Sequence, residues 1–259
     1  MTTSENLFVG VDVGASRTKV AVLDEAGGLI GYDVARSGTD FERTATQCLE
    51  HALGMAGMPG RNGFPCISTG YGRRNVSFSQ DTKTEIGCHA RGCFHYFPMA
   101  ITIIDIGGQD NKVIKLDDEG RRLNFKMNRK CAAGTGAFLE EMAMRLEVPL
   151  EDMDGLARQS EQVVELGSYC TVFSGTEVLE KIRQGIRVPD LVKAIFNSMI
   201  KRVLEMDSLA GRVVLTGGVV ANNPYLVEMV REIVEHDILV PEHPQLTGAV
   251  GAALFAMEV

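Results

Sequence analysis

The sequence lacks the features that direct a chain to a membrane or to a nucleic acid. No stretch approaches the roughly 20 apolar residues that a membrane span requires, and the N-terminus, MTTSENLFVGVD, has no long apolar run or small-residue cleavage site of a signal peptide. Basic residues are too few for a broad anion-binding surface, because 26 Lys and Arg stand against 34 Asp and Glu. We expect a cytoplasmic protein that binds neither membrane nor nucleic acid.

Cysteine is also scarce, with six residues spread over a chain of 259. This density is too low for a disulfide scaffold, and in a reducing compartment cysteines are more often buried, catalytic or metal-binding than paired. No low-complexity linker divides the chain. The composition, 45% hydrophobic and 23% charged, is sufficient for a sizeable core in one large domain or in two lobes that touch along a cleft.

Two common nucleotide-binding motifs are missing as well. Neither GxxxxGK[ST] nor GxGxxG after the first strand occurs, which disfavours P-loop and Rossmann binding. What is present is an internal repeat, because VDVGASRTKVAVLD (11–24) aligns without gaps with IDIGGQDNKVIKLD (104–117) and pairs Asp12 with Asp105. Each copy reads as an apolar strand, a glycine turn and a second strand, which predicts a β-hairpin.

The rest of the chain alternates between strand and helix patterns, which favours α/β lobes. Short strands are expected around 65–72 and 212–217. Helices are expected over 41–57, 136–148, 150–160, 189–206, 226–236 and 247–257. We expect an N-terminal lobe over 1–100, a C-terminal lobe over 101–245, and a terminal helix within 246–259 that packs back on the first lobe.

Three glycine turns, DVGAS, DIGGQ and TGGVV, each follow an apolar strand, and such turns let backbone N–H groups approach an anion closely. Asp12 and Asp105 end their strands, where two carboxylates can hold a hydrated Mg²⁺. Lys19 adds positive charge, and Gln109 is placed to orient an attacking water. One DxG turn would only close a hairpin, but two in register with a later TGG favour a phosphate site.

The motifs DVGASRTK, DIGGQD and TGGVVAN resemble the two phosphate motifs and the adenosine motif of the actin, sugar-kinase and Hsp70 ATPase superfamily. The resemblance implies an α/β fold of duplicated ribonuclease-H-like lobes around a nucleotide cleft that holds ATP or ADP with Mg²⁺. The implied catalytic residues are Asp12, Asp105 and Gln109. The implied nucleotide-binding residues are Gly14, Ala15, Ser16, Lys19, Gly107, Gly108, Gly134, Gly217, Gly218, Asn222 and Gln245.

The stretches MNRKCAAGTGAFLEEM and CTVFSGTEV, with STGYGRRNV and TEIGCHARG, are similar to a narrower group. These are the ATP-dependent activators of 2-hydroxyacyl-CoA dehydratases and the related ATPase subunits of benzoyl-CoA reductases. The resemblance implies that Cys131 and Cys170 meet their symmetry mates in a homodimer and bind one [4Fe–4S] cluster. It also implies an upstream ferredoxin or flavodoxin, and an iron–sulfur dehydratase or acyl-CoA reductase as electron acceptor.

The position of Cys131 before a predicted helix suggests how the chain would stabilise a cluster. A helix start presents free N–H groups and a positive dipole end, which favour an anionic cluster as they favour a phosphate. CTVFSGTEVLEKI predicts a second helix behind Cys170. The chain departs from the family's pattern at Arg129 and Lys130 and at SGT (174–176), which leaves both ligands intact and bears on partner contacts.

Other interpretations remain open from the residues alone. Cys88, His89, Cys93 and His95 are metal-ligand types, but C-x₄-C without a second pair is a weak zinc signal. Cys48 and Cys66 are expected to be buried and inert. Cys131 is alternatively a nucleophile. Arg73, Arg74 and Arg91 are either a docking surface or solvated charges. A benzoyl-CoA reductase subunit and a small-molecule kinase are the alternative functions.

Overall fold

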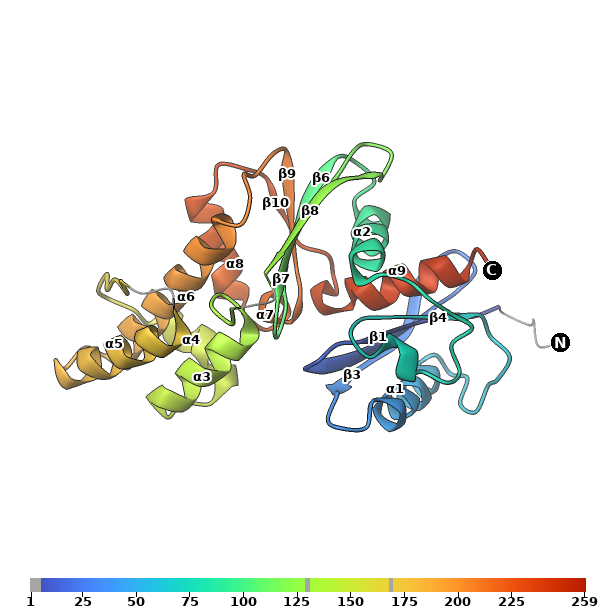
Figure 1. Ribbon diagram of the computed structural model, residues 1–259, viewed down its shortest axis with the longest axis horizontal. Helices are drawn as coiled ribbons and strands as arrows, with labels where there is room; N and C mark the ends of the chain where they lie inside the picture. The colour runs from blue at the N-terminus through green and yellow to red at the C-terminus, as the bar shows by residue number, and fades with distance from the viewer. Residues whose placement is uncertain (1–5, 129–130, 168–169) are drawn as a thin grey trace. The chain divides into compact units, whose positions relative to one another are not determined.

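The computed structural model describes residues 6–128, 131–167 and 170–259 and divides the chain into two compact units (Figure 1). The first unit contains the residues up to 99 together with 116–122 and 245–259, and the second contains 100–115 and 123–244. Within the described ranges, no helix combines the length and the apolar character needed to cross a membrane.

The first unit is built on a five-stranded sheet with the order β3-β2-β1-β4-β5. Strands β1 to β3 pair antiparallel, whereas β4 pairs parallel with both β1 and β5. The elements are β1 (Phe8–Val13), β2 (Arg17–Leu23), β3 (Leu29–Arg36), α1 (Phe41–Met55), β4 (Cys66–Thr69), the 3₁₀ turn η1 (Arg73–Asn75), β5 (Asp81–Thr82), α2 (Glu85–Tyr96) and α9 (Thr247–Ala256).

Strand β1 separates two helical layers, as Figure 1 shows. Its alternate residues Val9, Val11 and Val13 pack in the cluster that contains α1. On the other face, a Cβ atom added to Gly10 would overlap the carbonyl oxygen of Ala249, so α9 lies directly against the backbone of β1. Helix α9 is almost entirely small and apolar, and its opposite side packs against α2. The C-terminal helix therefore belongs to the first unit.

The second unit contains a sheet with the order β10-β9-β6-β7-β8, in which β9 pairs parallel with both β6 and β10. Its strands are β6 (Ile101–Ile106), β7 (Asn111–Leu116), β8 (Arg122–Asn128), β9 (Arg212–Thr216) and β10 (Ile238–Leu239). Its helices are α3 (Gly136–Leu146), α4 (Met153–Arg158), α5 (Thr171–Arg183), α6 (Val188–Leu204), α7 (Gly218–Asn222) and α8 (Pro224–Ile233), with 3₁₀ turns η2 (Leu150–Asp152) and η3 (Pro244–Leu246).

Read from its other edge, the second sheet has the order β8-β7-β6-β9-β10, so β6 to β10 take the places that β1 to β5 have in the first sheet. This equivalence confirms the expected duplication and extends it beyond the hairpins. Strand β4 lies beside β1 as β9 lies beside β6, and each ends in a Thr-Gly pair. Thr69 is in register with Asp12, and Thr216 is in register with Asp105. Each repeated aspartate therefore lies beside the start of another glycine turn.

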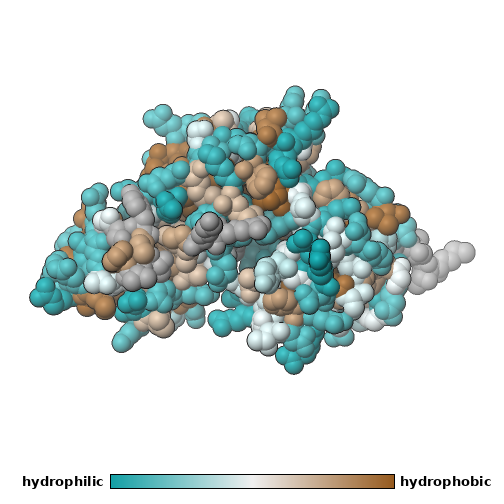
Figure 2. Space-filling model, viewed as in Figure 1, coloured by the Kyte–Doolittle hydropathy of each residue, from teal (hydrophilic) through white to brown (hydrophobic). Residues whose placement is uncertain are grey.

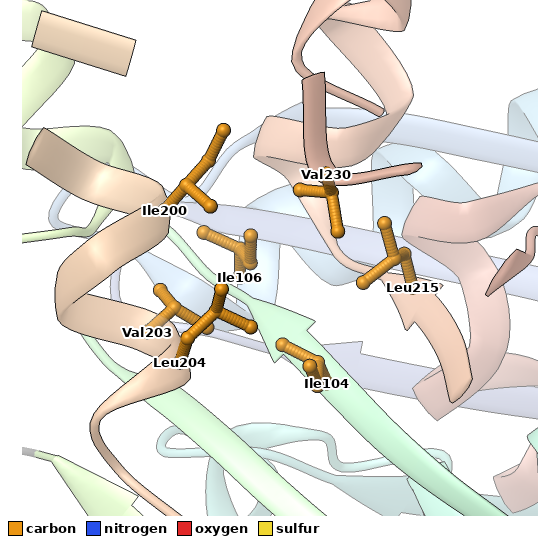
Figure 3. Close-up of a pocket in the computed structure, with 7 residues that line it drawn as sticks. All are labelled: Ile104, Ile106, Ile200, Val203, Leu204, Leu215 and Val230. Atoms are coloured by element: carbon orange, nitrogen blue, oxygen red, sulfur yellow. The ribbon is translucent and has the colours of Figure 1, made fainter. Parts of the chain in front are cut away.

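Helices α6 and α8 cover one face of the second sheet (Figure 3). The figure shows apolar side chains from these helices and from β6 and β9 converging on a small gap, lined by Ile104, Ile106, Ile200, Val203, Leu204, Leu215 and Val230. The gap is about the size of one water molecule and offers no polar partner. It is a dry packing gap rather than a ligand site.

The helices expected from periodicity are all present, with ends shifted by a few residues. The helix expected over 150–160 is a 3₁₀ turn followed by α4, and TGGVVANN contains the short helix α7. Helix α2 and strands β3, β5, β8 and β10 were not predicted. These strands are very short or only partly buried, so they carry little of the apolar alternation that identifies a strand.

Candidate functional site

Asp12, one residue before the end of β1, is a buried carboxylate with one oxygen hydrogen-bonded and the other without a partner in the part of the chain that the structure describes. The hairpin register places it opposite Lys19 on β2, and Oδ2 accepts a hydrogen bond from Lys19 Nζ at 2.9 Å. Asp12 is only 2% exposed, and its Oδ1 has no hydrogen-bond partner among the described residues. Burying a carboxylate oxygen without a partner costs free energy of folding, so Oδ1 is a candidate to bind a cation or a hydrogen-bond donor from outside the chain.

Two glycines keep the space around Asp12 open. Gly70, directly after β4, has a φ of +86°, and a Cβ atom there would lie 2.5 Å from Asp12 Oδ1. A Cβ atom on Gly248, in the first turn of α9, would lie 3.1 Å from Oδ2. Carboxylate oxygens are the ligands that Mg²⁺ prefers, so the residues present fit this ion. Neither glycine was among the predicted site residues, although the GYG that follows β4 was a usable signal for Gly70.

The first glycine turn closes the β1–β2 hairpin. The N–H of Gly14 donates to the carbonyl of Arg17 at 3.0 Å, and its own carbonyl accepts from the Ser37 hydroxyl at 2.7 Å. The carbonyl of Ser16 accepts from the N–H of Ser37 at 3.1 Å, and Ala15 is exposed at the tip. The Gly14 amide is therefore already used within the hairpin, so an anion would have to bind at the following residues of the turn.

The second aspartate is paired more completely than the first. Lys112 Nζ donates to Asp105 Oδ2 at 3.0 Å and to Asp110 Oδ1 at 2.6 Å, and this lysine is only 1% exposed. A Cβ atom on Gly217, which has a φ of +102°, would lie 2.8 Å from Asp105 Oδ1. Gln109 is exposed on the same turn. Lys112 was aligned with Lys19 by the repeat but was not predicted as a site residue.

The predicted adenosine motif forms the turn between β9 and α7. The N–H of Gly217 donates to the carbonyl of Pro244 at 2.9 Å, and Gly218 is the first residue of α7. The side-chain amide of Asn222 is exposed and donates to the carbonyl of Gly218 at 2.7 Å. Gln245 follows Pro244 in the chain and is partly exposed in the first unit.

The turn that carries Cys131 is held by two asparagines from the second sheet. Asn128 Nδ2, at the end of β8, donates to the carbonyl of Cys131 at 3.0 Å. Asn111 Nδ2, at the start of β7, donates to the carbonyl of Gly134 at 2.8 Å. Gly134 has a φ of +81°, which favours glycine. The Cys131 side chain is half-buried, so its sulfur is accessible from a fixed backbone.

The expectation that free amides at the start of α3 face the cluster is wrong. The N–H of Gly136 donates to the carbonyl of Gly107 at 2.9 Å, and the N–H of Ala137 donates to the carbonyl of Gly108 at 2.8 Å. These are the first two residues of α3. Both amides therefore already donate to carbonyl oxygens of the second glycine turn, which the fold brings next to the start of α3.

Cys170 is exposed and stands immediately before α5, which begins at Thr171 as expected. Glu177, about two helical turns further on, accepts from the N–H of Gly167 with both carboxylate oxygens, at 2.9 and 3.0 Å. This contact ties the loop that leads to Cys170 to the helix that follows it. Sequence reasoning missed Glu177, which lies in the CTVFSGTEV stretch.

The departures from the family's pattern fall in two places. Arg129 and Lys130 lie outside the described residues. In SGT, a Cβ atom on Gly175 would lie 2.6 Å from the guanidinium of Arg145 on α3. Arg145 pairs with Glu141 at 2.7 Å along the same helix. Glycine at position 175 thus lets this ion pair of α3 lie against the backbone of α5.

The remaining four cysteines are buried in the first unit. Burial raises the pKa of the Cys48, Cys66 and Cys88 thiols to about 12. A thiol with such a pKa is protonated at neutral pH and is a poor nucleophile or metal ligand. The prediction that Cys48 and Cys66 are buried is confirmed, and the two accessible thiols of the chain are those of the CAAGTG and CTVF motifs.

The CHARGCFH segment lies within α2, and its His89 belongs to the buried face of this helix. His89 Nδ1 lies 3.0 Å from the hydroxyl of Thr247 at the start of α9, and both residues are buried. Cys88 is buried against Ala252 and Ala256 of α9, Cys93 is also buried, and His95 is exposed near the helix end. Among the residues that the structure describes, no three His, Cys, Asp or Glu side chains form a metal-binding group.

The three arginines that the sequence left open as a docking surface or as solvated charges have different surroundings. Arg73 donates from its guanidinium to the carbonyl of Gly70 at 3.0 Å and so supports the turn beside Asp12. Arg91 pairs with Glu258 at 2.6 Å on the surface, and Arg74 is exposed. Surface ion pairs of this kind contribute little to stability.

Residues 9–256 match the BadF/BadG/BcrA/BcrD ATPase family. The chain belongs to this family. It is 40% identical over 253 residues to the 2-hydroxyisocaproyl-CoA dehydratase activator of Clostridioides difficile, with 96% of this chain and 94% of the relative covered. The solved structure of an activator from that organism with bound ADPNP has a TM-score of 0.90 at 38% identity, covering 97% of this chain and 94% of that one.

Two further relatives widen the comparison. Component A of (R)-2-hydroxyglutaryl-CoA dehydratase from Acidaminococcus fermentans has a TM-score of 0.91 at 34% identity, with 98% of each chain covered. A benzoyl-CoA reductase subunit of Thauera aromatica is 27% identical over 262 residues, covering 96% of this chain and 92% of the relative. The fold is thus the duplicated, actin-like ATPase fold that the resemblance of the three motifs implied.

Proposed function

We propose that this protein is an ATP-dependent one-electron donor that activates a 2-hydroxyacyl-CoA dehydratase. The observation that carries the proposal is the distribution of thiols: Cys131 and Cys170 are accessible, and the other four cysteines are buried. The likeness to dehydratase activators over nearly the whole chain supports the partner. A ferredoxin or flavodoxin supplies the electron, and ATP hydrolysis drives its low-potential transfer to the partner.

ATP binds in this proposal at the three glycine turns. Asp12 and Asp105 hold Mg²⁺, which neutralises charge on the phosphates, and the partnerless Oδ1 of Asp12 supports its role. Lys19 and Lys112 fix the two carboxylates by donating to one oxygen of each. Gln109 is exposed on its turn and orients the attacking water.

The [4Fe–4S] cluster is held by Cys131 and Cys170 of two copies, because a four-iron cluster takes four thiolates and one chain offers two accessible ones. The surface beside Cys170 supports a homodimer. Figure 2 shows brown, hydrophobic atoms at the end of the second unit where Figure 1 labels α5, and the exposed hydrophobic residues there are Phe173, Leu179 and Ile182. The bound cluster supplies one-electron redox chemistry.

A test is anaerobic reconstitution of the chain with iron and sulfide, followed by iron analysis. We expect about four irons per dimer. Cys131→Ser or Cys170→Ser should abolish iron binding, whereas Cys48→Ala, which changes a buried thiol, should retain it. The proposal fails if the natural chain binds no iron, or if the two serine variants bind as much as the natural chain.

The likeness to the Thauera aromatica benzoyl-CoA reductase chain favours a second candidate, an ATPase component of an acyl-CoA reductase. Such a component would pair with a related but different chain. Sedimentation of the anaerobically purified protein, alone and co-expressed with neighbouring ATPase genes, separates a homodimer from a heterodimer.

A kinase of the same superfamily would use the nucleotide without the cysteines. The double variant Cys131→Ser, Cys170→Ser would then retain phosphoryl transfer to a small hydroxyl compound. Under our proposal the double variant loses both iron binding and electron transfer. The natural chain, in turn, phosphorylates no small hydroxyl compound.

A further inference from the structure

The second glycine turn and the CAAGTG turn are joined by backbone and side-chain hydrogen bonds. We call this contact the seam, and its members are Gly107, Gly108, Asn111, Gly134, Gly136 and Ala137. Three hydrogen bonds of 2.8 to 2.9 Å cross it, two from the amides that open α3 and one from the Asn111 side chain. All members lie in the second unit, so the seam is a contact within one compact body.

Asn111 supplies the side-chain donor among these three bonds. It is fully buried, and its neighbour Lys112 bridges Asp105 and Asp110. Successive residues of a strand point to opposite faces, so these two neighbours contact different segments. Lys112 contacts the two aspartates, and Asn111 contacts the turn that carries Cys131. A shift of the glycine turn is thus carried directly to Gly134.

The turn beyond the seam has little freedom to absorb such a shift. A Cβ atom on Gly134 would lie 3.3 Å from Asn111 Nδ2 and 3.3 Å from the Arg202 side chain on α6. The carbonyl of Cys131 is held separately by Asn128. Since packed interiors transmit strain rather than absorb it, displacement of Gly134 changes the position of Cys131.

We propose that Asn111 is a positioning residue that makes the position of Cys131 depend on the ligand at the second glycine turn. The inference rests on the proposed function, because it requires a nucleotide at that turn. Under it, the amides that open α3 serve to bind the two turns together. The nucleotide is therefore sensed at Cys131 through three hydrogen bonds within a single chain.

The test measures the alkylation rate of Cys131 in the cluster-free, full-length chain by mass spectrometry, with and without ADPNP and Mg²⁺. In the natural chain we expect ADPNP to change this rate by about fivefold or more, the usual lower range for coupled sites. In Asn111→Ala, ADPNP should still bind, but the rate should change by less than about twofold.

The matched control is Thr102→Val. Thr102 is also buried in the second sheet, and its hydroxyl donates to the carbonyl of Ala210 at 2.8 Å, away from the seam. This variant also loses one buried hydrogen bond from side chain to backbone, and it should keep the full response at Cys131. An equal loss in both variants would overturn the proposal, because it would show a general effect of destabilisation.

A second pair of variants keeps the test decisive if Asn111→Ala does not fold. Gly136→Pro removes the amide that donates to Gly107, at the first position of α3, where proline is accepted after the extended Thr135. Gly136→Ala adds a similar Cβ atom but keeps the amide. Only the proline variant should lose the response. Equal responses in the pair overturn the inference.

The outcomes also separate the inference from the function on which it rests. Failure of the natural chain to bind ADPNP overturns both. Binding of ADPNP without any change at Cys131 overturns the inference alone, since iron binding by Cys131 and Cys170 would be unaffected.

Discussion

The space around one carboxylate oxygen of Asp12 is open because the neighbouring residue, Gly70, has no side chain. Gly70 borders Oδ1 so closely that a Cβ atom there would lie 2.5 Å from this oxygen. Its counterpart in the second unit, Gly217, stands in the same relation to Asp105. The duplicated site therefore depends on two glycines that carry no chemistry of their own.

Replacement of Gly70 by alanine should lower ATPase activity by about 10- to 100-fold, because a small displacement at a reacting centre has effects of this size. It should also cost more than the roughly 1 to 2 kcal/mol of an unfavourable φ of +86°, because the Cβ atom would also lie 2.5 Å from the carbonyl oxygen of Val13. Steady-state ATPase assays and urea unfolding measure the two effects.

Gly57→Ala is the matched control. Gly57 has a φ of +75°, but a Cβ atom there meets nothing within 4 Å. It should lose only the roughly 1 to 2 kcal/mol of the unfavourable φ and keep its ATPase activity. If both variants lose activity alike, crowding of Asp12 is not the cause.

At the scale of elements, the first unit depends on how closely α9 approaches its neighbours. A Cβ atom on Gly251 would overlap the carbonyl oxygen of Cys88 on α2. Glycine is usually unfavourable within a helix, so its presence here reflects the contact rather than helix propensity.

Gly251→Ala should therefore destabilise the protein by about 1 to 3 kcal/mol through overpacking, despite the better helix propensity of alanine. Gly54→Ala, on the open side of α1, should instead stabilise it by about 0.5 to 1 kcal/mol. Thermal and urea unfolding test the sign. Stabilisation by both substitutions would contradict the close contact of α2 with α9.

The elements also show what the sequence can predict. The hairpins and most of the helices were predicted because each depends on a local period of apolar residues, whereas α2 and α7 were not predicted. Gly70, Lys112 and the seam were not placed in the site because each depends on contacts between segments far apart in the chain. The prediction of free amides at the start of α3 was wrong for the same reason, because Gly107 and Gly108 lie next to these amides only after the chain has folded.

At the scale of the molecule, the thiols are partitioned between the units. Four are buried in the first unit, and the two accessible ones are in the second. Oxidation or metal binding should therefore affect one unit and leave the other unchanged.

This partition predicts alkaline sensitivity of the first unit. Burial raises the pKa of Cys48, Cys66 and Cys88 from 9.0 to about 12, so above pH 9 the unfolded chain releases these protons before the folded chain does. The free energy of unfolding should fall as the pH rises from 9 toward 12.

Urea unfolding at pH 8 and pH 10.5 measures the change. The variant Cys48→Ala, Cys66→Ala should lose less stability between these values than the natural chain. At pH 8, iodoacetamide should modify Cys131 and Cys170 in the folded, cluster-free chain, and the buried thiols only after unfolding. An identical pH response in the variant would contradict the assignment.

The equal strand order of the two sheets makes their connections directly comparable. Between the third and fourth strands of each sheet, the chain runs through residues 37–65 in the first unit and 129–211 in the second. Both accessible cysteines lie in the longer of these excursions. The second unit thus carries, at an equivalent point of its sheet, an excursion more than twice as long as that of the first unit, and this added length contains both accessible thiols.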